Sequence, residues 1–139
     1  MVLNDKSLES SMGISFPGKR VELIHLLNEL SDKIAQENLW VKHRDYPNNS
    51  GIDAVIHFFF NDTDIAQDAY SEIGSILKNS LEADRLQELS LGLDKMLDRL
   101  GNVDSETFMR DAEWASIVKL AANALTEMCD LRGKAEGAK

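Results

Sequence analysis

The sequence predicts an all-α fold, a compact bundle of five to six helices. Three observations favour this class. Apolar residues recur at steps of three and four along much of the chain, which is the period of a helix with one buried face. Capping residues and glycines stand at the ends of several of these stripes. The one β-prone apolar run has no evident partner strand.

A chain of 139 residues is long enough for one domain whose core needs no disulfide. Residues 1–17 are weakly patterned, and we expect them to form a flexible arm. A single helical domain is predicted over 18–133. The small and polar residues 134–139 predict a frayed tail.

The first predicted helix runs from 18 to about 38, where apolar residues share one face. A loop is predicted over 42–51, because this segment contains Pro47 and Gly51. A second helix is expected to begin at the capping residues 61–64 and to continue to about 78.

Residues 52–60 allow two interpretations. Four apolar residues have the spacing i, i+3, i+4 and i+7 of a short helix: Ile52, Val55, Ile56 and Phe59. The run from Val55 to Phe60 also suits a buried strand. We favour the helix because no partner strand is evident.

The clearest stripe of the chain lies between Leu86 and Leu100 and predicts a long amphipathic helix. Gly101 is a typical residue at a helix C-terminus, and Asp104 or Ser105 is expected to begin a short turn or helix. The last helix is expected to begin its apolar face at Trp114 and to end at Gly133.

Charge and composition exclude several functional classes. Fifteen basic against 24 acidic residues give a formal charge of −9, which disfavours binding to nucleic acid or to an anionic membrane. No apolar run is long enough to span a bilayer, and residues 1–15 do not resemble a secretory signal. A cytoplasmic location is therefore expected. The single cysteine, Cys129, excludes an internal disulfide.

No catalytic constellation is recognisable, so we expect neither an enzyme nor a cofactor. The three histidines have no metal-ligand spacing, and no nucleophile motif or phosphate loop is present. The acidic residues of 62–72 resemble part of a calcium loop. However, Gln67 stands where such a loop needs glycine, and Ile73 stands where it needs glutamate. We therefore predict no metal site.

Two acidic segments are the candidate partner-binding sites. The segment 61–72 has four carboxylates and no basic residue, and the segment 104–113 has four carboxylates and one arginine. Seven residues are predicted to contact a partner: Asp62, Asp64, Asp68, Glu72, Asp104, Glu106 and Asp111. The two segments could join into one patch that docks a basic protein, or each could be a solvated face.

Three aromatic residues lie in or beside the acidic segments, and interfaces favour such residues: Tyr70, Phe108 and Trp114. Trp114 lies on an apolar stripe, so we assign it to the core.

The order of several motifs resembles a family of small acidic helical bacterial proteins. These motifs include Asp62-Thr63-Asp64, then Ile73-Gly74-Ser75-Ile76-Leu77, and finally Glu113-Trp114 at the start of the last helix. Members of such families are found as immunity proteins in contact-dependent growth inhibition and other polymorphic toxin systems. The resemblance covers roughly residues 20–130 and implies no catalytic residues.

This resemblance implies an immunity protein that binds a cognate toxin, through the toxin's carboxy-terminal domain, and occludes its active site. Nuclease toxins are commonly basic, so the acidic segments agree with this function. The alternative is a structural or regulatory helical module that acts as a homo-oligomer. It is motivated by three successive phenylalanines, Phe58 to Phe60, because one short helix does not point all three inward. At least one of the rings is therefore expected to face a partner or a neighbouring element. The oligomeric state is left open.

Overall fold

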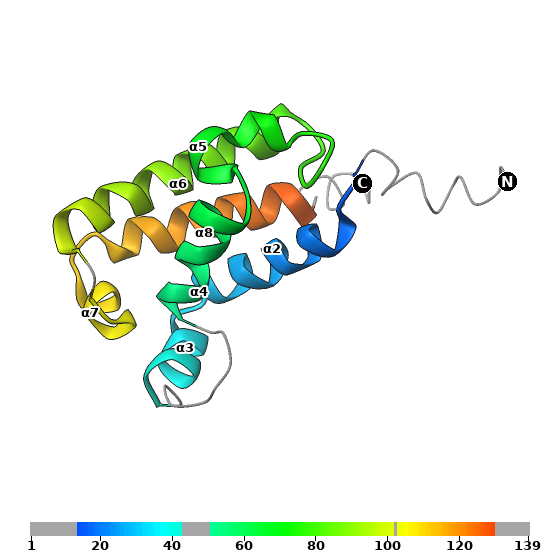
Figure 1. Cartoon of the computed structure of the whole chain (residues 1–139). Helices are drawn as coiled ribbons and strands as arrows, with labels where there is room; N and C mark the ends of the chain where they lie inside the picture. Colours follow the sequence, from blue (N-terminus) through cyan, green and yellow to red (C-terminus); the bar gives the residue numbers. More distant parts are fainter. Residues whose placement is uncertain (1–13, 43–50, 102, 130–139) are drawn as a thin grey trace, which may run out of the picture.

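The computed structural model describes residues 14–42, 51–101 and 103–129, and this part of the chain is all-α (Figure 1). It contains seven α-helices rather than the five to six predicted, because the first predicted helix is divided into two. They are α2 Pro17–Leu30, α3 Lys33–Gln36, α4 Ile52–Ile56, α5 Ile65–Asp68, α6 Ser80–Leu100, α7 Ser105–Arg110 and α8 Trp114–Cys129. Three helical turns extend the short helices: the π-helical turns η1 Glu37–Lys42 and η2 His57–Asp62, and the 3-10 turn η3 Ala69–Glu72.

The three longest helices form the body of the molecule. The last helix, α8, packs against both α6 and α2, while α5 and η3 pack against α6 (Figure 1). The stripe predicted on α6 is buried at Leu86, Leu89 and Leu93, where it forms one continuous core with residues of α2 and α8. The short helix α7 contacts η1, α4 and α8.

The single helix predicted over 18–38 is wrong, because α2 ends at Leu30 and a new helix begins after Asp32. The Asp32 carboxylate accepts hydrogen bonds from the amides of Ile34 and Ala35 at 3.0 and 3.1 Å. An aspartate that caps in this way offers the backbone an alternative to continuing the helix. The chain turns there and presents α3 at an angle to α2 (Figure 1).

Gln36 holds this turn against the last helix. Its amide nitrogen donates to the carbonyls of Glu29 and Leu30 at 2.8 and 2.9 Å, and its amide oxygen accepts from the Trp114 indole nitrogen at 2.8 Å. Gln36 is fully buried, and these bonds satisfy the side chain at both of its ends. The start of α8 is therefore tied to the end of α2.

The helical interpretation of residues 52–60 is confirmed. The segment forms α4 and continues into η2, in which the turn is wider than in an α-helix. Phe58 and Phe59 are buried, and Phe60 is partly buried against the core. Phe60, the least buried of the three rings, packs against the core and so faces neighbouring elements of the same chain.

The continuous helix predicted from 61–64 to about 78 is also wrong. The short helix α5 passes into η3, and the chain then makes a tight turn at Gly74, which has φ of 98°. The backbone carbonyl of Glu72 accepts hydrogen bonds from three amides of this turn, those of Ser75, Ile76 and Leu77, at 3.1, 3.0 and 2.9 Å. The motif Ile73–Leu77 of the family resemblance therefore forms a turn.

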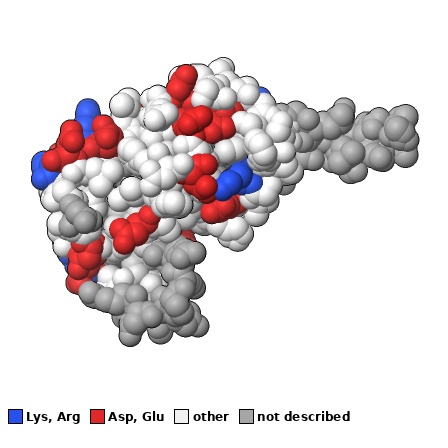
Figure 2. Space-filling model, viewed as in Figure 1, with Lys and Arg blue, Asp and Glu red and all other residues white. Residues whose placement is uncertain are grey.

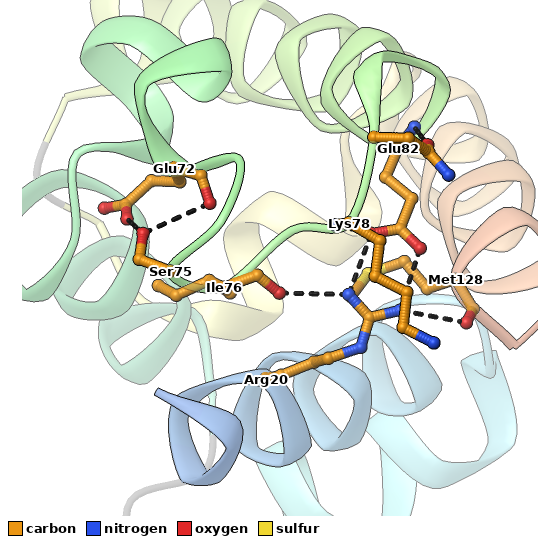
Figure 3. Close-up of polar contacts among 8 residues, drawn as sticks. Arg20, Glu72, Ser75, Ile76, Lys78, Glu82 and Met128 are labelled. Carbon is orange, nitrogen blue, oxygen red and sulfur yellow. Dashed lines mark hydrogen bonds and ion pairs between the residues drawn. The ribbon is translucent and has the colours of Figure 1, made fainter. Parts of the chain in front are cut away.

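A buried ion pair fastens this turn to three helices, and we call it the arginine clamp (Figure 3). Both guanidinium nitrogens of Arg20 on α2 bond to the two carboxylate oxygens of Glu82 on α6, each at 2.8 Å. The same guanidinium donates to the carbonyls of Ile76 at 3.0 Å and Met128 at 3.2 Å. The two side chains are only 10% and 3% exposed, so their charges are compensated mainly by each other, by these carbonyls and by the Lys78 amide, which donates to Glu82 at 2.8 Å.

The predictions for the second half of the chain are confirmed. Gly101 ends α6 with φ of 76°, and Asp104 caps α7 by accepting from the Thr107 amide at 2.9 Å. Trp114 begins α8 and is buried, as expected. Gly133, the predicted end of the last helix, and the predicted tail 134–139 lie outside the described residues.

The predicted loop and the predicted arm fall mostly on residues that are not described, namely 43–50 and 1–13. Of the arm, Ile14 is buried, and the amides of Ser15 and Phe16 donate to the carbonyls of Gly74 and Ser75 at 2.9 and 2.8 Å. Among the described helices, none is both long and apolar enough to cross a bilayer.

Candidate functional site

The structure separates the two acidic segments of the candidate site. The segment 61–72 lies on η2, α5 and η3, and the last two pack along α6. The segment 104–113 surrounds α7, which lies beyond the carboxyl end of α6 (Figure 1). Figure 2 shows acidic side chains in several separate groups on this face, some of them with basic side chains beside them. The described residues thus form two acidic sites and not one joined patch.

The carboxylates around α7 are engaged with partners of the same chain. Asp104 accepts from the amide and the hydroxyl of Thr107, while Glu106 lies 3.2 Å from Arg110. Asp111 accepts two bonds from the Arg99 guanidinium, at 2.9 and 2.7 Å, and a third from the Glu113 amide. The Arg99 bonds, together with the amide bond, lower the pKa of Asp111 from 3.8 to about 2.

A shallow hollow of about 440 Å³ is lined by six residues: Leu100, Asp104, Glu106, Thr107, Arg110 and Asp111. Two arginines neutralise much of its charge, since Arg99 binds Asp111, and Arg110 binds both Glu106 and Glu37. We therefore expect this hollow to attract a basic partner less strongly than its count of carboxylates suggests.

Two of the four carboxylates in the first segment are also engaged. Asp62 forms an ion pair with Lys19 of α2. Glu72 accepts from the Asp64 amide at 2.8 Å and from the Ser75 hydroxyl at 2.5 Å, so it serves the turn shown in Figure 3. Both side chains line a smaller hollow of about 170 Å³, together with Phe16 and Ile76.

Within the described part of the chain, Asp64 and Asp68 are two predicted contact residues whose charges are not compensated by a basic side chain. Both residues are exposed, and no described lysine or arginine forms an ion pair with either of them. The Asp68 carboxylate accepts from the Tyr70 amide at 3.2 Å, which caps η3 but leaves the negative charge uncompensated. These two carboxylates are therefore available to a cation from outside the chain.

Beside them stands Tyr70, whose exposed fraction is 44%. Its hydroxyl donates to the Asp84 carboxylate on α6, and this bond fixes the ring on the surface of that helix. The hydrogen bond to Asp84 is the main cause of a raised pKa of Tyr70, with smaller contributions from desolvation and from the charges of Asp84, Asp68 and Glu88. An exposed aromatic ring thus lies among three carboxylates.

Ile73 adds an apolar side chain to this surface. It directly follows η3, three residues after Tyr70. Its amide donates to the Tyr70 carbonyl at 3.2 Å, and its exposed fraction is 39%. We call Asp68, Tyr70, Ile73, Asp84 and Glu88 the tyrosine face.

The sequence indicated part of this face. Tyr70 was one of three aromatic candidates, of which Phe108 and Trp114 are buried. The acidic residues of α6 were not predicted, although Asp84 and Glu88 are four residues apart and therefore share a side of the helix. Among the described residues, no group of three or more His, Cys, Asp or Glu side chains is placed to hold a metal ion.

A family model for a domain of unknown function, DUF7945, matches residues 14–136. The chain belongs to the DUF7945 family. No curated protein and no solved structure matches the chain. The match begins at Ile14, the first residue of the described structure, so the short stretch that pairs with the Gly74 turn is part of the family domain.

Proposed function

We propose that this DUF7945 protein is an immunity protein, which binds a cognate basic toxin in the cytoplasm and neutralises it without catalysis. The bound partner is the carboxy-terminal toxin domain, and inhibition follows from occlusion of its active site. The observation that carries this proposal is the tyrosine face with its neighbour Asp64, where exposed carboxylates surround an exposed aromatic ring. Such a combination is typical of protein interfaces that receive basic partners.

The charge of the whole chain supports the same partner. A formal charge of −9 attracts a basic domain over distances of about a Debye length, roughly 10 Å at ordinary salt. A nuclease-type toxin fits this requirement, because its own substrate is a polyanion. The homo-oligomer alternative loses its motivation, since Phe58 and Phe59 are buried and Phe60 packs against the core.

The proposal is tested by co-expression in a heterologous bacterium. The candidate toxin domain is identified by pull-down from the source cells with the tagged protein, washed at moderate salt. We expect the wild-type chain to restore growth of cells that express this domain. Growth arrest in the presence of the soluble chain, for a domain that binds it in purified form, would show that binding does not neutralise and would overturn the immunity function.

A pair of variants with equal charge change tests the site. Asp64→Asn/Asp68→Asn removes two charges at the proposed interface and retains an oxygen that caps η3. Asp94→Asn/Asp98→Asn removes two charges from exposed positions near the carboxyl end of α6. We expect the first double variant to slow association with the toxin several-fold more than the second, because charges close to the interface dominate steering. Equal rates for both variants would remove Asp64 and Asp68 from the interface.

A further inference from the structure

We propose that Tyr70 is the anchor of the interface, and that a lysine or arginine side chain of the partner lies over its ring between Asp68, Asp84 and Glu88. This inference deepens the proposed function and rests on it for the identity of the partner. It assigns a binding mode to Tyr70 and extends the site from the segment 61–72 to Ile73 and to Asp84 and Glu88 of α6.

The first support is that the Tyr70 ring is already in place. Its hydroxyl is bound to Asp84, and its amide is bound to Asp68, so both ends of the residue are held by carboxylates. A side chain that is fixed before binding loses little conformational entropy when a partner arrives. Its exposed fraction of 44% leaves ring surface for contact.

The second support is the charge around the ring. The described residues of this face contribute three carboxylates, from Asp68, Asp84 and Glu88, and one nearby guanidinium, from Arg85. Arg85 lies 3.6 Å from Glu88, so it offsets only one of the three charges. A cation above the ring is attracted by the ring face and by the remaining carboxylates together. This arrangement selects a cationic side chain and disfavours an acidic one.

The third support separates a protein partner from a small cation. Ile73 has an exposed fraction of 39% and lies three residues after Tyr70, to whose carbonyl its amide donates. A simple ion gains nothing from this apolar neighbour, whereas a peptide segment covers it with the stem of the basic residue or with an adjacent apolar side chain. The surface therefore fits a basic amphipathic segment of a protein.

The probe for this inference is a short amphipathic peptide of leucine and arginine, which requires no knowledge of the toxin. We titrate it into the isotopically labelled full chain and follow the amide signals by NMR. We expect the largest shift changes at 68–73 and 84–88. The matched peptide of leucine and glutamate should cause no saturable change.

Single variants then test the anchor. Tyr70→Ala should raise the dissociation constant of the peptide by at least about fivefold, because one favourable cation–aromatic contact is lost. The control is Ile34→Ala on α3, which removes the most exposed of the large apolar side chains described. This variant should change the dissociation constant by less than about twofold. Tyr70→Phe should retain most of the affinity, because it keeps the ring.

Two results would overturn the anchor: shift changes centred on α7 instead of η3, or equal affinities for Tyr70→Ala and Ile34→Ala. Either result would leave the growth test of the immunity function intact. Conversely, peptide binding at Tyr70 together with failed protection from the toxin would retain the anchor and reject the immunity function.

Discussion

At the scale of single residues, the contact between Tyr70 and Asp84 makes a tyrosine hydroxyl harder to ionise. The phenol donates its proton to a carboxylate, and the tyrosinate would face that carboxylate with a like charge. For this reason the pKa of Tyr70 is raised above its ordinary value of 10.0, with the Asp84 hydrogen bond as the main cause.

This contact can be measured directly, because the chain has only two tyrosines, Tyr46 and Tyr70. In a Tyr46→Phe background, tyrosinate absorbance reports Tyr70 alone. We expect Asp84→Asn to lower the pKa of Tyr70 toward its ordinary value, and Asp94→Asn, on the same helix, to leave it unchanged. Equal titration curves for all three proteins would mean that the Asp84 bond does not form in solution.

The pKa of Asp111 is lowered, whereas that of Tyr70 is raised. Its pKa in the folded chain is about 2, below the ordinary 3.8, so it stabilises the fold above about pH 4 and loses this contribution as the pH falls toward 2. We expect the stability difference between the wild type and Asp111→Asn to be constant near neutral pH and to shrink over that acid range. Urea unfolding at several pH values measures it.

The Arg99→Gln background provides the control for Asp111, because the bonds from Arg99 are the largest cause of the lowered pKa. In this background, the effect of Asp111→Asn on the free energy of unfolding should depend only weakly on pH between about 4 and 2. A difference between wild type and Asp111→Asn that stays constant down to the lowest pH at which both remain folded would contradict the assignment.

The roles of individual acidic residues are the part of the site that the sequence could not reveal. The sequence shows that Asp62, Glu72 and Asp111 are carboxylates in acidic segments, and this part of the prediction needed no structure. Their partners are Lys19, the Asp64 amide and Arg99, which lie between 8 and 43 residues away. Only the fold distinguishes an engaged carboxylate from a free one such as Asp64.

At the scale of elements, two glycines end or begin helices with backbone angles that other residues rarely adopt. Gly51 precedes α4 with φ of 105°, and Gly101 follows α6 with φ of 76°. A Cβ atom at Gly51 would lie 2.9 Å from the Ser105 hydroxyl oxygen, whereas nothing lies within 4 Å of one at Gly101. The Ser105 oxygen also accepts from the Ile52 amide at 2.9 Å.

We therefore expect Gly51→Ala to destabilise the fold more than Gly101→Ala. Strain alone costs about 1–3 kcal/mol at each position, and the displaced bond from Ile52 to Ser105 adds about 1 kcal/mol at Gly51. Urea denaturation measures both variants. In a Ser105→Ala background the two losses should become similar, and a gap that persists there would point to another cause.

Helix α6, which has 21 residues, was predictable because an apolar stripe runs from Leu86 to Leu100 and Gly101 marks its carboxyl end. The ends of the helices at Leu30 and Asp68 were not predictable in this way, although Asp32 and Gly74 stand close to them in the sequence. Each break depends on a contact from a distant element, such as the Trp114 indole on Gln36. The π-helical turn η2 was not predictable either, because a run of three phenylalanines does not indicate whether the helix has an α-helical or a π-helical turn.

At the scale of the whole molecule, the arginine clamp joins α2, α6, α8 and the Gly74 turn. Arg20→Met leaves the Glu82 carboxylate buried without its cation, and we expect a loss of about 3–5 kcal/mol in the free energy of unfolding. Arg20→Met/Glu82→Leu should lose less than Arg20→Met alone, because no unpaired charge remains in the interior. Urea denaturation monitored by circular dichroism provides the comparison.

The exposed pair of Lys19 and Asp62 is the matched control for the clamp. Its side chains are 35% and 33% exposed, so Lys19→Met should cost no more than about 1 kcal/mol. A double variant as unstable as Arg20→Met would show that the bonds to the Ile76 and Met128 carbonyls, and not the ion pair, carry the clamp.

The arginine clamp also has a consequence for the order in which the molecule assembles during synthesis. Arg20 precedes its acceptors at Ile76, Glu82 and Met128 by 56, 62 and 108 residues of chain. Contacts of such separation form only after the intervening chain has been ordered. The guanidinium therefore acquires its four bonds in stages, and the set is complete only after the carboxyl end of α8 has been translated and has packed against α2.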